Sequence, residues 1–328
     1  MASKAGVNVL NDEKQEARGE DPFDIFSLPA INTDYEKHVE IFVEPSSHIT
    51  QTGPIVFKWQ TLGGERWDSS KLEIETTYRI MKGALDTTDA DDVAVISSLP
   101  ITHFDKIELK MNDEIVTDSS AGNHAYHAYI AQKNTYSRNV KREILKRTEC
   151  YYEEEPDKID QFALAFDPVD SSKPVKDAFR EKHDAWVKNQ KDLITRTQPY
   201  LDLCSVNQYY PTDIDYVMTL TRNSESFCLL SERGNEGIYK ILIKRIRLIV
   251  RKIIPAPHMV DREAAYFVDK KATAYIPYTH STMTTRLLQA NTLQCTFSDV
   301  CGTQPTLPKQ LFVFMVDHVA FSGEESFY

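Results

Sequence analysis

An alternation of apolar and polar residues between Asp213 and Ile254 constrains the fold more than any other feature of the chain. Its first part, DIDYVMTLTR, places Tyr216, Met218 and Leu220 two residues apart, which is the period of a half-buried β-strand. The polar residues NSES end this run, FCLL (227–230) resumes it, and a long segment, YKILIKRIRLIVRKII, then follows, in which six basic residues interleave with apolar ones. No face of that segment is apolar enough for a membrane, so the pattern indicates paired strands of a sheet.

Similar alternation recurs along the chain, with helical spacing at a few places. Strands are expected at 38–43, 55–59, 71–81, 106–111, 114–117, 200–205, 215–222, 226–230, 239–253, 272–279, 287–297 and 310–321. Helices are expected at 122–136, within 173–192 and at 257–268, and a hairpin turn at Asn112 and Asp113, which tolerate a positive φ. Strand-rich halves with helices in their loops favour a mainly β fold, a pair of β-sandwiches, over an α/β fold.

Length and composition predict more than one hydrophobic core. A chain of 328 residues, 41% of them hydrophobic, is large enough for two domains of about 150 residues each. The polar and highly charged N-terminus predicts a flexible arm at 1–24. One globular unit is then expected at 25–195 and a second at 196–328.

Charge and cysteine content exclude several classes of protein. A net charge of −11 argues against generic binding to polyanions, because neutralising phosphates drives sequence-independent nucleic-acid affinity. No apolar signal segment follows Met1 and no run approaches the ~18 apolar residues of a spanning helix, so no membrane span is expected. The five cysteines are widely spaced and form no CxxC motif, which favours free thiols in a reducing compartment: Cys150, Cys204, Cys228, Cys295 and Cys301. A pairing of Cys295 with Cys301 stays open.

Several separated segments carry motifs in a fixed order. They are FDIFSLPAINTDYEKHVEIFVEP (23–45), PIVFKW (54–59) with WDSSKLEIETTYRI (67–80), FDKIELKMNDEIVT with NHAYHAYIAQKNTYS (within 104–137), LTRNSESFCLL (220–230) and LPKQLFVFMVDHVAFSG (307–323). In this order the segments resemble the double jelly-roll, hexon-like major capsid proteins of polinton (Maverick) elements, adintoviruses and related DNA viruses. The segment before the hairpin, ISSLPITHF, is shorter than the corresponding segment of that family.

The resemblance implies two jelly rolls in tandem, with helical insertions, and a structural rather than enzymatic role. It implies a homotrimer that makes a pseudo-hexagonal capsomer of an icosahedral virion, assembled in the host nucleus or cytoplasm. The implied partners are neighbouring capsomers and a penton-type single jelly-roll protein, with a packaging ATPase and a maturation protease encoded nearby. In that family a segment similar to AFSG is followed by further residues that complete the second barrel. The second jelly roll at 196–328 is therefore expected to be incomplete.

Two other classes of function remain open at this stage. One is a jelly-roll carbohydrate-active or amidase-type enzyme, for which the only dense supply of carboxylates is Glu149, Glu153, Glu154 and Glu155. The other is a host-genome remnant of a capsid gene that serves as an interaction module.

The chain offers few candidates for a chemical site, and we expect no catalytic, cofactor-binding or metal-binding residue. His124 and His127 are three residues apart on an expected helix and share a face, but no HExxH motif surrounds them. Asp89, Asp91 and Asp92 form an acidic cluster without the Gly and Glu of an EF-hand loop. Packing for the histidines and solvation for the aspartates are the more common roles.

Two further features have a structural and a functional interpretation. Gly63 and Gly64 lack a following helix or a GK[ST] motif, so they predict a turn and not a phosphate-binding loop. The basic strand Lys240 to Lys252 could face encapsidated DNA through a weak contact, a neighbouring subunit, or solvent, and solvent is the most common case.

Overall fold

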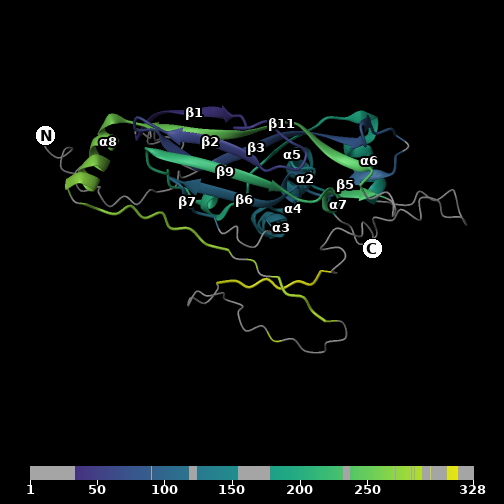
Figure 1. Ribbon diagram of the computed structural model, residues 1–328. Helices are drawn as coiled ribbons and strands as arrows, with labels where there is room; N and C mark the ends of the chain where they lie inside the picture. Colours follow the sequence, from purple (N-terminus) through teal and green to yellow (C-terminus); the bar gives the residue numbers. More distant parts are fainter. Residues whose placement is uncertain are drawn as a thin grey trace, which may run out of the picture.

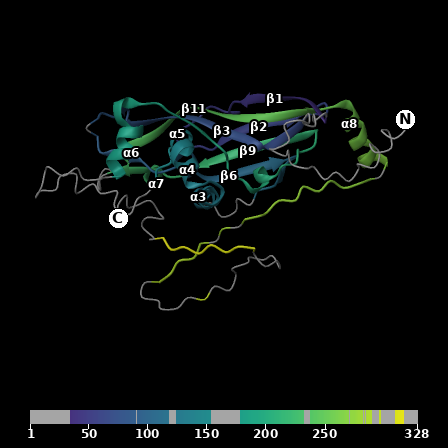
Figure 2. The same cartoon turned by 180° about the vertical axis from the view of Figure 1, so that it is seen from behind.

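The structure, a computed structural model, describes residues 34–89, 91–117, 124–153, 178–231, 237–269, 271–281, 283, 285–289, 296 and 309–316. Two antiparallel β-sheets pack face to face and form the body of this part of the chain (Figure 1). Short helices gather at one end of the sheets, and helix α8 (Pro257–Ala264) lies at the other end, as the view from behind also shows (Figure 2).

The first sheet has the strand order β1 (Tyr35–Val43), β11 (Tyr239–Pro255), β3 (Arg66–Lys82) and β4 (Leu85–Asp86), and β8 (Leu193–Thr197) also pairs with β3. The longest pairing joins β3 to β11. Along both strands, buried residues alternate with charged or partly exposed ones over most of the length. One face of this sheet therefore lies on the core and the other faces solvent, as is common for antiparallel sheets.

The second sheet has the order β2 (Ile55–Thr61), β9 (Ile214–Arg222), β6 (Phe104–Met111) and β7 (Glu114–Ile115). The strand β9 lies in the middle of this sheet, and its side chains Tyr216, Met218 and Leu220 are completely buried. The turn between β6 and β7 has positive φ angles of 47° at Asn112 and 70° at Asp113. The hairpin predicted from these two residues is thus confirmed.

The strand pairing defines a jelly roll. Eight strands, taken in chain order, are β1, β2, β3, β6, β7, β8, β9 and β11. The eighth pairs with the first and the third, and the sixth also pairs with the third. In the other sheet the seventh pairs with the second and the fourth, and the fourth pairs with the fifth. Two sheets connected in this way form a jelly-roll sandwich, so the expected mainly β, jelly-roll fold is confirmed.

The expected division at residues 195 and 196 is revised by these pairings. Both β9 and β11 belong to the range predicted to open a second unit, yet they complete the sheets that β1, β2, β3 and β6 begin. Periodicity identifies a strand but not its partner, so the boundary was placed inside one sandwich. Among the described residues after Pro255 there are two helical elements and no strand. A second jelly roll, with its expected incompleteness, therefore stays a prediction, and the expected arm at 1–24 lies outside the described residues.

The hydrophobic core lies between the two sheets and centres on aromatic side chains. Trp67 and Tyr216 are 0% exposed, and their ring centroids are 4.7 Å apart in an edge-to-face arrangement. Trp59 and Tyr210 pack against the same pair. These side chains come from both sheets and from the loop before β9, so the cluster joins the sheets across the core.

Helices and short elements connect the strands. They are β5 (Val93–Val95), α2 (Leu99–Thr102), α3 (His124–Thr135), α4 (Arg138–Val140), η1 (Lys141–Leu145), α5 (Lys146–Thr148), α6 (Ala178–Trp186), η2 (Lys188–Gln190), η3 (Asp202–Ser205), α7 (Glu225–Cys228), β10 (Leu229–Ser231) and η4 (Ala265–Asp269). The helices α3, α6 and α8 confirm the three expected helices. No helix in the described part of the chain is long and apolar enough to cross a membrane.

Several expected strands have another conformation. The range 226–230 begins with one helical turn, because Ser224 caps it by accepting a hydrogen bond from the Phe227 N–H before β10 starts. The range 200–205 contains the 3₁₀ turn η3. Residues 272–279, 287–289, 296 and 310–316 belong to no strand, and the rest of the expected late strands lies outside the described residues.

Candidate functional site

Asp91 belongs to the acidic cluster predicted at 89–92. Both oxygens of its carboxylate make contacts within the chain. One oxygen lies 2.5 Å from Lys82 Nζ and 3.3 Å from the Tyr239 hydroxyl, and the other accepts hydrogen bonds from the Thr88 N–H and hydroxyl. Burial by itself raises the pKa of Asp91, but the hydrogen bonds from Lys82 and Thr88 outweigh it and lower the pKa to about 2. Asp91 therefore fastens its loop to β3 and β11.

The two neighbouring carboxylates have different partners. Asp92 pairs with Arg180 of α6 at 2.9 Å, and Asp89 accepts a hydrogen bond from the Asn189 N–H at 2.8 Å. Because the three carboxylates have separate partners, they do not converge on a shared cation. The solvated-loop interpretation was incomplete as well, since each carboxylate has a contact within the chain.

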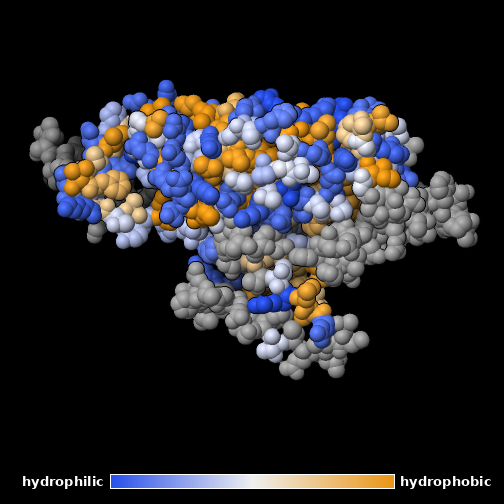
Figure 3. Space-filling model, in the orientation of Figure 1, coloured by the Kyte–Doolittle hydropathy of each residue, from blue (hydrophilic) through white to orange (hydrophobic). Residues whose placement is uncertain are grey.

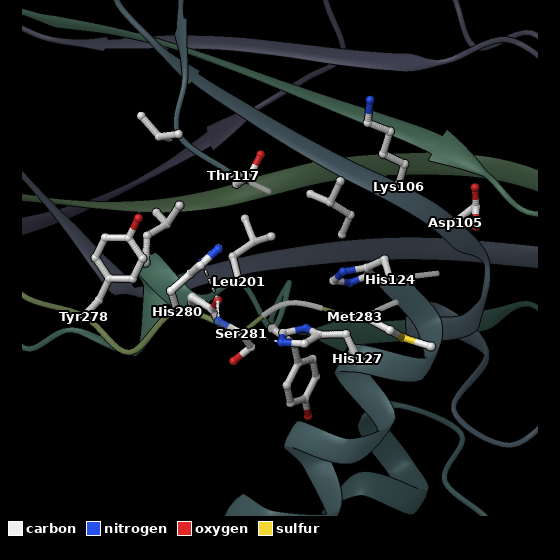
Figure 4. A pocket seen from close by; sticks show the side chains of 15 residues that line it. Asp105, Lys106, Thr117, His124, His127, Leu201, Tyr278, His280, Ser281 and Met283 are labelled. Atoms are coloured by element: carbon white, nitrogen blue, oxygen red, sulfur yellow. Dashed lines mark hydrogen bonds and ion pairs between the residues drawn. The ribbon is translucent and has the colours of Figure 1, made fainter. Parts of the chain in front are cut away.

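The predicted histidine pair borders a small cavity of about 70 Å³ (Figure 4). His124 and His127 lie on the first turn of α3, with ring centroids 6.4 Å apart. Residues from four other parts of the chain complete the lining, among them Lys106 of β6, Asp202 of η3 and His280 beyond α8. Tertiary structure thus adds a third histidine and a carboxylate to the pair seen in the sequence.

Asp202 is the centre of this arrangement. One of its oxygens lies 3.5 Å from His127 Nε2, and the other lies 3.4 Å from His280 Nδ1 and accepts a hydrogen bond from the Ser281 N–H at 2.6 Å. Burial tends to raise the pKa of Asp202, but the contacts with His127 and Ser281 outweigh burial and lower the pKa. The carboxylate is therefore held in its ionised form.

The cavity does not have the donor arrangement of a metal centre. Burial, with a smaller contribution from the neighbouring His127, lowers the pKa of His124 to about 3, so this ring stays neutral. Among the described residues, no group of three or more His, Cys, Asp or Glu side chains is arranged to hold a metal ion. What the arrangement can do is join α3, η3 and the segment after α8 through contacts with the Asp202 carboxylate.

Glu149, the first of the carboxylates considered for an enzyme, lies in a buried network. Its oxygens accept hydrogen bonds from the Gln132 amide and the Thr197 hydroxyl, both at 2.7 Å, and from the Tyr200 hydroxyl at 3.2 Å. Burial raises the pKa of Glu149, although these hydrogen bonds oppose the rise. The network connects α3 to β8 and the segment after it, and Glu149 does not line the cavity.

The remaining carboxylates of that acidic run do not add to a catalytic site among the described residues. Glu153 pairs with Arg138 at 2.6 Å and with Arg142 at 3.5 Å. Glu154 and Glu155 lie outside the described residues. A pair of carboxylates facing a common cleft, as an enzyme of the glycosidase type requires, is not formed by Glu149 and Glu153.

The basic strand β11 carries its charges on a face that also bears carboxylates. Five of its six basic residues form ion pairs with described residues of this chain: Lys244 with Asp192, Arg245 with Glu44, Arg247 with Glu75, Arg251 with Glu40 and Lys252 with Glu65. The Arg247 guanidinium also lies 4.0 Å from the centre of the Phe42 ring. The alternating signs weaken the positive potential of this face, so solvent exposure fits β11 better than contact with DNA.

The structure tests the turn predicted at Gly63 and Gly64 and the prediction of free cysteines. Gly63 and Gly64 have φ angles of 62° and 88° in the turn between β2 and β3, which confirms the turn. Cys150, Cys204 and Cys228 are free thiols. Cys295 and Cys301 lie outside the described residues, so their pairing stays untested.

Sequence reasoning missed Asp202 and His280 as members of the cavity. Asp202 stands alone between Leu201 and Leu203, and His280 lies in a Thr- and Ser-rich segment, so neither has a motif around it. The only local signal was the pair His124 and His127. Their partners are brought to them by the return of the chain after β8 and after α8.

Comparisons with known proteins give a fold-level similarity only. No protein-family model and no curated protein matches the sequence. Among solved structures, the chain is similar to the mavirus major capsid protein, with 12% identity, 74% of this chain and 51% of that chain covered, and a TM-score of 0.38. It is also similar to a chain in the structure of the Sputnik virophage, with 10% identity, 73% and 53% coverage, and a TM-score of 0.41. The chain spans about half the length of these two proteins.

Proposed function

We propose that this chain is a structural capsid protein whose homotrimers form pseudo-hexagonal capsomers of an icosahedral virion. The observation that carries the proposal is the eight-stranded jelly-roll pairing of β1 to β11. The ordered motifs that resemble the polinton and adintovirus family provide independent support. Because one fold hosts many functions, the fold by itself does not decide the function, and the proposal rests on the fold together with these motifs.

A shell of this kind is stabilised by repeated weak contacts between subunits and requires no catalytic centre. Two jelly rolls in each chain would give a trimer six similar lateral faces, and many weak contacts between capsomers add up to a stable lattice. The proposed partners are neighbouring copies and a penton-type single jelly-roll protein. The place of action is the virion, with assembly in the host nucleus or cytoplasm.

The enzyme alternative is less well supported by the described residues. Glu149 is 3% exposed and satisfied by Gln132, Thr197 and Tyr200, so it lacks access to a substrate. Neither Glu149 nor Glu153 lines the cavity at His127. The interaction-module alternative shares the fold, and only its state of assembly distinguishes it from a capsid protein.

The oligomeric state tests the proposal. Size-exclusion chromatography with light scattering, at high micromolar concentration, is expected to give three times the chain mass of 37.6 kDa, or larger assemblies. Cross-linking of a mixture of ¹⁴N- and ¹⁵N-labelled chains then identifies links between copies. A real interface should involve well over ~1,000 Å² and hence several cross-linked regions of the sandwich.

The same experiment separates the alternatives. A monomer at all salt concentrations and pH values, with no cross-link between differently labelled chains, would contradict the capsid proposal. A monomer that also binds glycans on an array would favour the enzyme class. A discrete hetero-complex, formed with host proteins and without self-assembly, would favour the interaction module.

A further inference from the structure

Exposed basic residues gather on the short helices that follow α3. Arg142 lies in η1, Lys146 and Arg147 lie in α5, and all three are exposed. Arg138 of α4 is 69% exposed at its side chain. Residues four apart share a face of a helix, so Arg138, Arg142 and Lys146 follow one another along the surface. We call Arg138, Arg142, Lys146 and Arg147 the basic cluster; the exposed Glu143 of η1 offsets one of its charges.

The carboxylates around the basic cluster are too few to neutralise it. Arg138 and Arg142 share a single partner, Glu153, at 2.6 Å and 3.5 Å. Lys146 and Arg147 form no ion pair with any part of the chain that the structure describes. On β11, by contrast, five of six basic residues have a carboxylate partner. The basic cluster therefore keeps a surplus of positive charge in a chain that is negative as a whole.

Exposed carboxylates gather at the end of the second sheet, where β6 ends and β9 begins. Asp113 and Glu114 belong to the turn between β6 and β7, and Asp213 and Asp215 lie at the start of β9. The Asn112 N–H donates to the Asp215 carbonyl at 2.9 Å, which holds the two segments side by side. Within the described residues, none of the four exposed carboxylates has an ion-pair partner. We call Asp113, Glu114, Asp213 and Asp215 the acidic corner.

The two clusters lie in different parts of the molecule. The acidic corner is at the α8 end of the sandwich, because the Asp213 N–H donates to the Thr61 carbonyl at the end of β2, and Arg66, after the next turn, pairs with Glu263 of α8. The helices α4 and α5, which carry much of the basic cluster, lie away from α8 in both views (Figures 1 and 2). Ion pairs between the two clusters can therefore form between copies of the chain, but not within one copy.

We propose that the basic cluster of one copy contacts the acidic corner of a second copy. The inference rests on the proposed function, because it names the surfaces through which copies of a capsid protein meet. Two different surfaces form such a contact, so it is heterologous, and a heterologous contact closes into a ring when its rotation fits, as a trimer requires. Charge acts over about 10 Å at ordinary ionic strength, so local complementarity can align copies although each carries a net charge of −11.

A second copy fits the basic cluster better than a nucleic acid does. The net charge of −11 repels a polyanion before any local contact forms. Binding of phosphates would also leave the four unpaired carboxylates of the acidic corner unexplained, whereas one contact between copies accounts for both clusters.

Reversal of the basic cluster is the first test. A basic-reversed variant carries Arg142→Glu, Lys146→Glu and Arg147→Glu, and analytical ultracentrifugation of the full chain measures its self-association. At about 50 mM salt, where surface charges are weakly screened, the wild-type chain should associate, and about 0.5 M salt should weaken this association. The variant places like charges opposite each other, so its association should be weaker by about tenfold or more. An unchanged melting temperature shows that it is folded.

Reversal of the acidic corner is the second test. This acidic-reversed variant carries Glu114→Lys and Asp215→Lys together with Asp113→Asn and Asp213→Asn. Asparagine is used at the last two positions because their φ angles are 70° and 59°, which it tolerates. The variant should lose association as the basic-reversed variant does. A combined variant with both sets of substitutions again has opposite charges on the two surfaces, so it should recover association.

The matched control has the same change of net charge as the basic-reversed variant. It carries Lys71→Glu, Lys191→Glu and Lys240→Glu, at exposed lysines outside both clusters that form no ion pair with a described residue. Its association should equal that of the wild type, because the contact depends on where the charges lie and not on their sum.

The outcomes separate this contact from the proposed function. Trimers that persist in every variant would overturn the contact and leave the capsid proposal standing. Open chains of copies, lost in both reversed variants and recovered in the combined one, would support the contact and contradict a trimeric capsomer. A combined variant that is folded but does not associate would overturn the contact, and a monomeric wild-type chain would contradict both proposals. A DNA duplex that binds the wild type but not the basic-reversed variant, with self-association unchanged, would assign the basic cluster to nucleic acid instead.

Discussion

Trp59 of β2 and Tyr216 of β9 face each other in register and stack with ring centroids 5.2 Å apart and planes inclined by 10°. The stack joins the second strand of the jelly roll to its seventh. A chain that lacks the later strand cannot bury Trp59, so the early and late strands depend on one another for a common core.

The first prediction concerns this stack. Tyr216→Ala should lower the free energy of unfolding by about 3–5 kcal/mol, because it leaves a cavity among buried aromatic rings. Urea denaturation followed by tryptophan fluorescence measures the loss. Tyr275→Ala is the control, since Tyr275 is 81% exposed and its removal should change stability by less than about 0.5 kcal/mol. Equal effects of the two substitutions would contradict the assignment of β9 to this sandwich.

The second prediction concerns Asp91, whose pKa is lowered to about 2. A lowered pKa stabilises the fold above the ordinary aspartate value, and this contribution disappears as the pH falls towards about 2. Asp91→Asn should therefore destabilise the chain by about 1 kcal/mol at neutral pH, a value reduced for the exposure of Lys82, and by less at about pH 3. Asp92→Asn, which alters an exposed pair in the same loop, should have a smaller effect. A pH-independent loss in Asp91→Asn would argue against the ionic contribution.

The third prediction concerns Glu149, whose pKa is raised by burial. The folded chain then binds a proton more readily than the unfolded chain, so the contribution of Glu149 to stability falls as the pH rises from the ordinary glutamate value through the raised one. Glu149→Gln should remove this slope, and the difference from wild type should change with pH. Chemical denaturation at several pH values measures it. Glu153→Gln should leave the slope unchanged, and an identical slope in wild type and Glu149→Gln would refute the assignment.

The fourth prediction concerns metal. Because neither His124 and His127 nor Asp89, Asp91 and Asp92 form a converging set of ligands, treatment with a chelator should leave the melting temperature and the oligomeric state unchanged. Differential scanning fluorimetry and elemental analysis of the purified chain test this. Stoichiometric metal, or a melting temperature several degrees lower in chelator, would contradict it.

The fifth prediction concerns the apolar segment LFVFMV at 311–316, whose side chains are 41–84% exposed although the Phe314 ring lies 6.0 Å from the Tyr126 ring of α3. Apolar side chains show below the body of the molecule in Figure 3, on the side where Figure 1 draws this segment in yellow. Exposed apolar residues of high strand propensity promote association between chains. Val313→Lys combined with Met315→Lys should reduce concentration-dependent light scattering without changing the melting temperature. Tyr275→Lys, at an exposed position outside this segment, should leave scattering unchanged. Unaltered scattering in the double variant would show that the segment does not drive association.

Local patterns predicted the elements that depend mainly on their own residues. The alternation of Tyr216, Met218 and Leu220 identified β9, and Asn112 with Asp113 identified the hairpin, because side-chain period and backbone conformation are short-range properties. The failures at 200–205 and 226–230 also have local causes. Short apolar runs suit a strand or a helical turn, and the Ser224 cap decided for the turn.

The pairing between strands could not be predicted from local sequence patterns. The sequence by itself determined that the chain is rich in half-buried strands, that β11 alternates basic and apolar residues, and that His124 and His127 share a helix face. Only the tertiary structure decided that β9 and β11 close the sheets begun by β2 and β3, and that Asp202 and His280 join His127. The physical reason is that periodicity records which side of a strand is buried, whereas partners and convergent side chains depend on contacts between residues far apart in the chain.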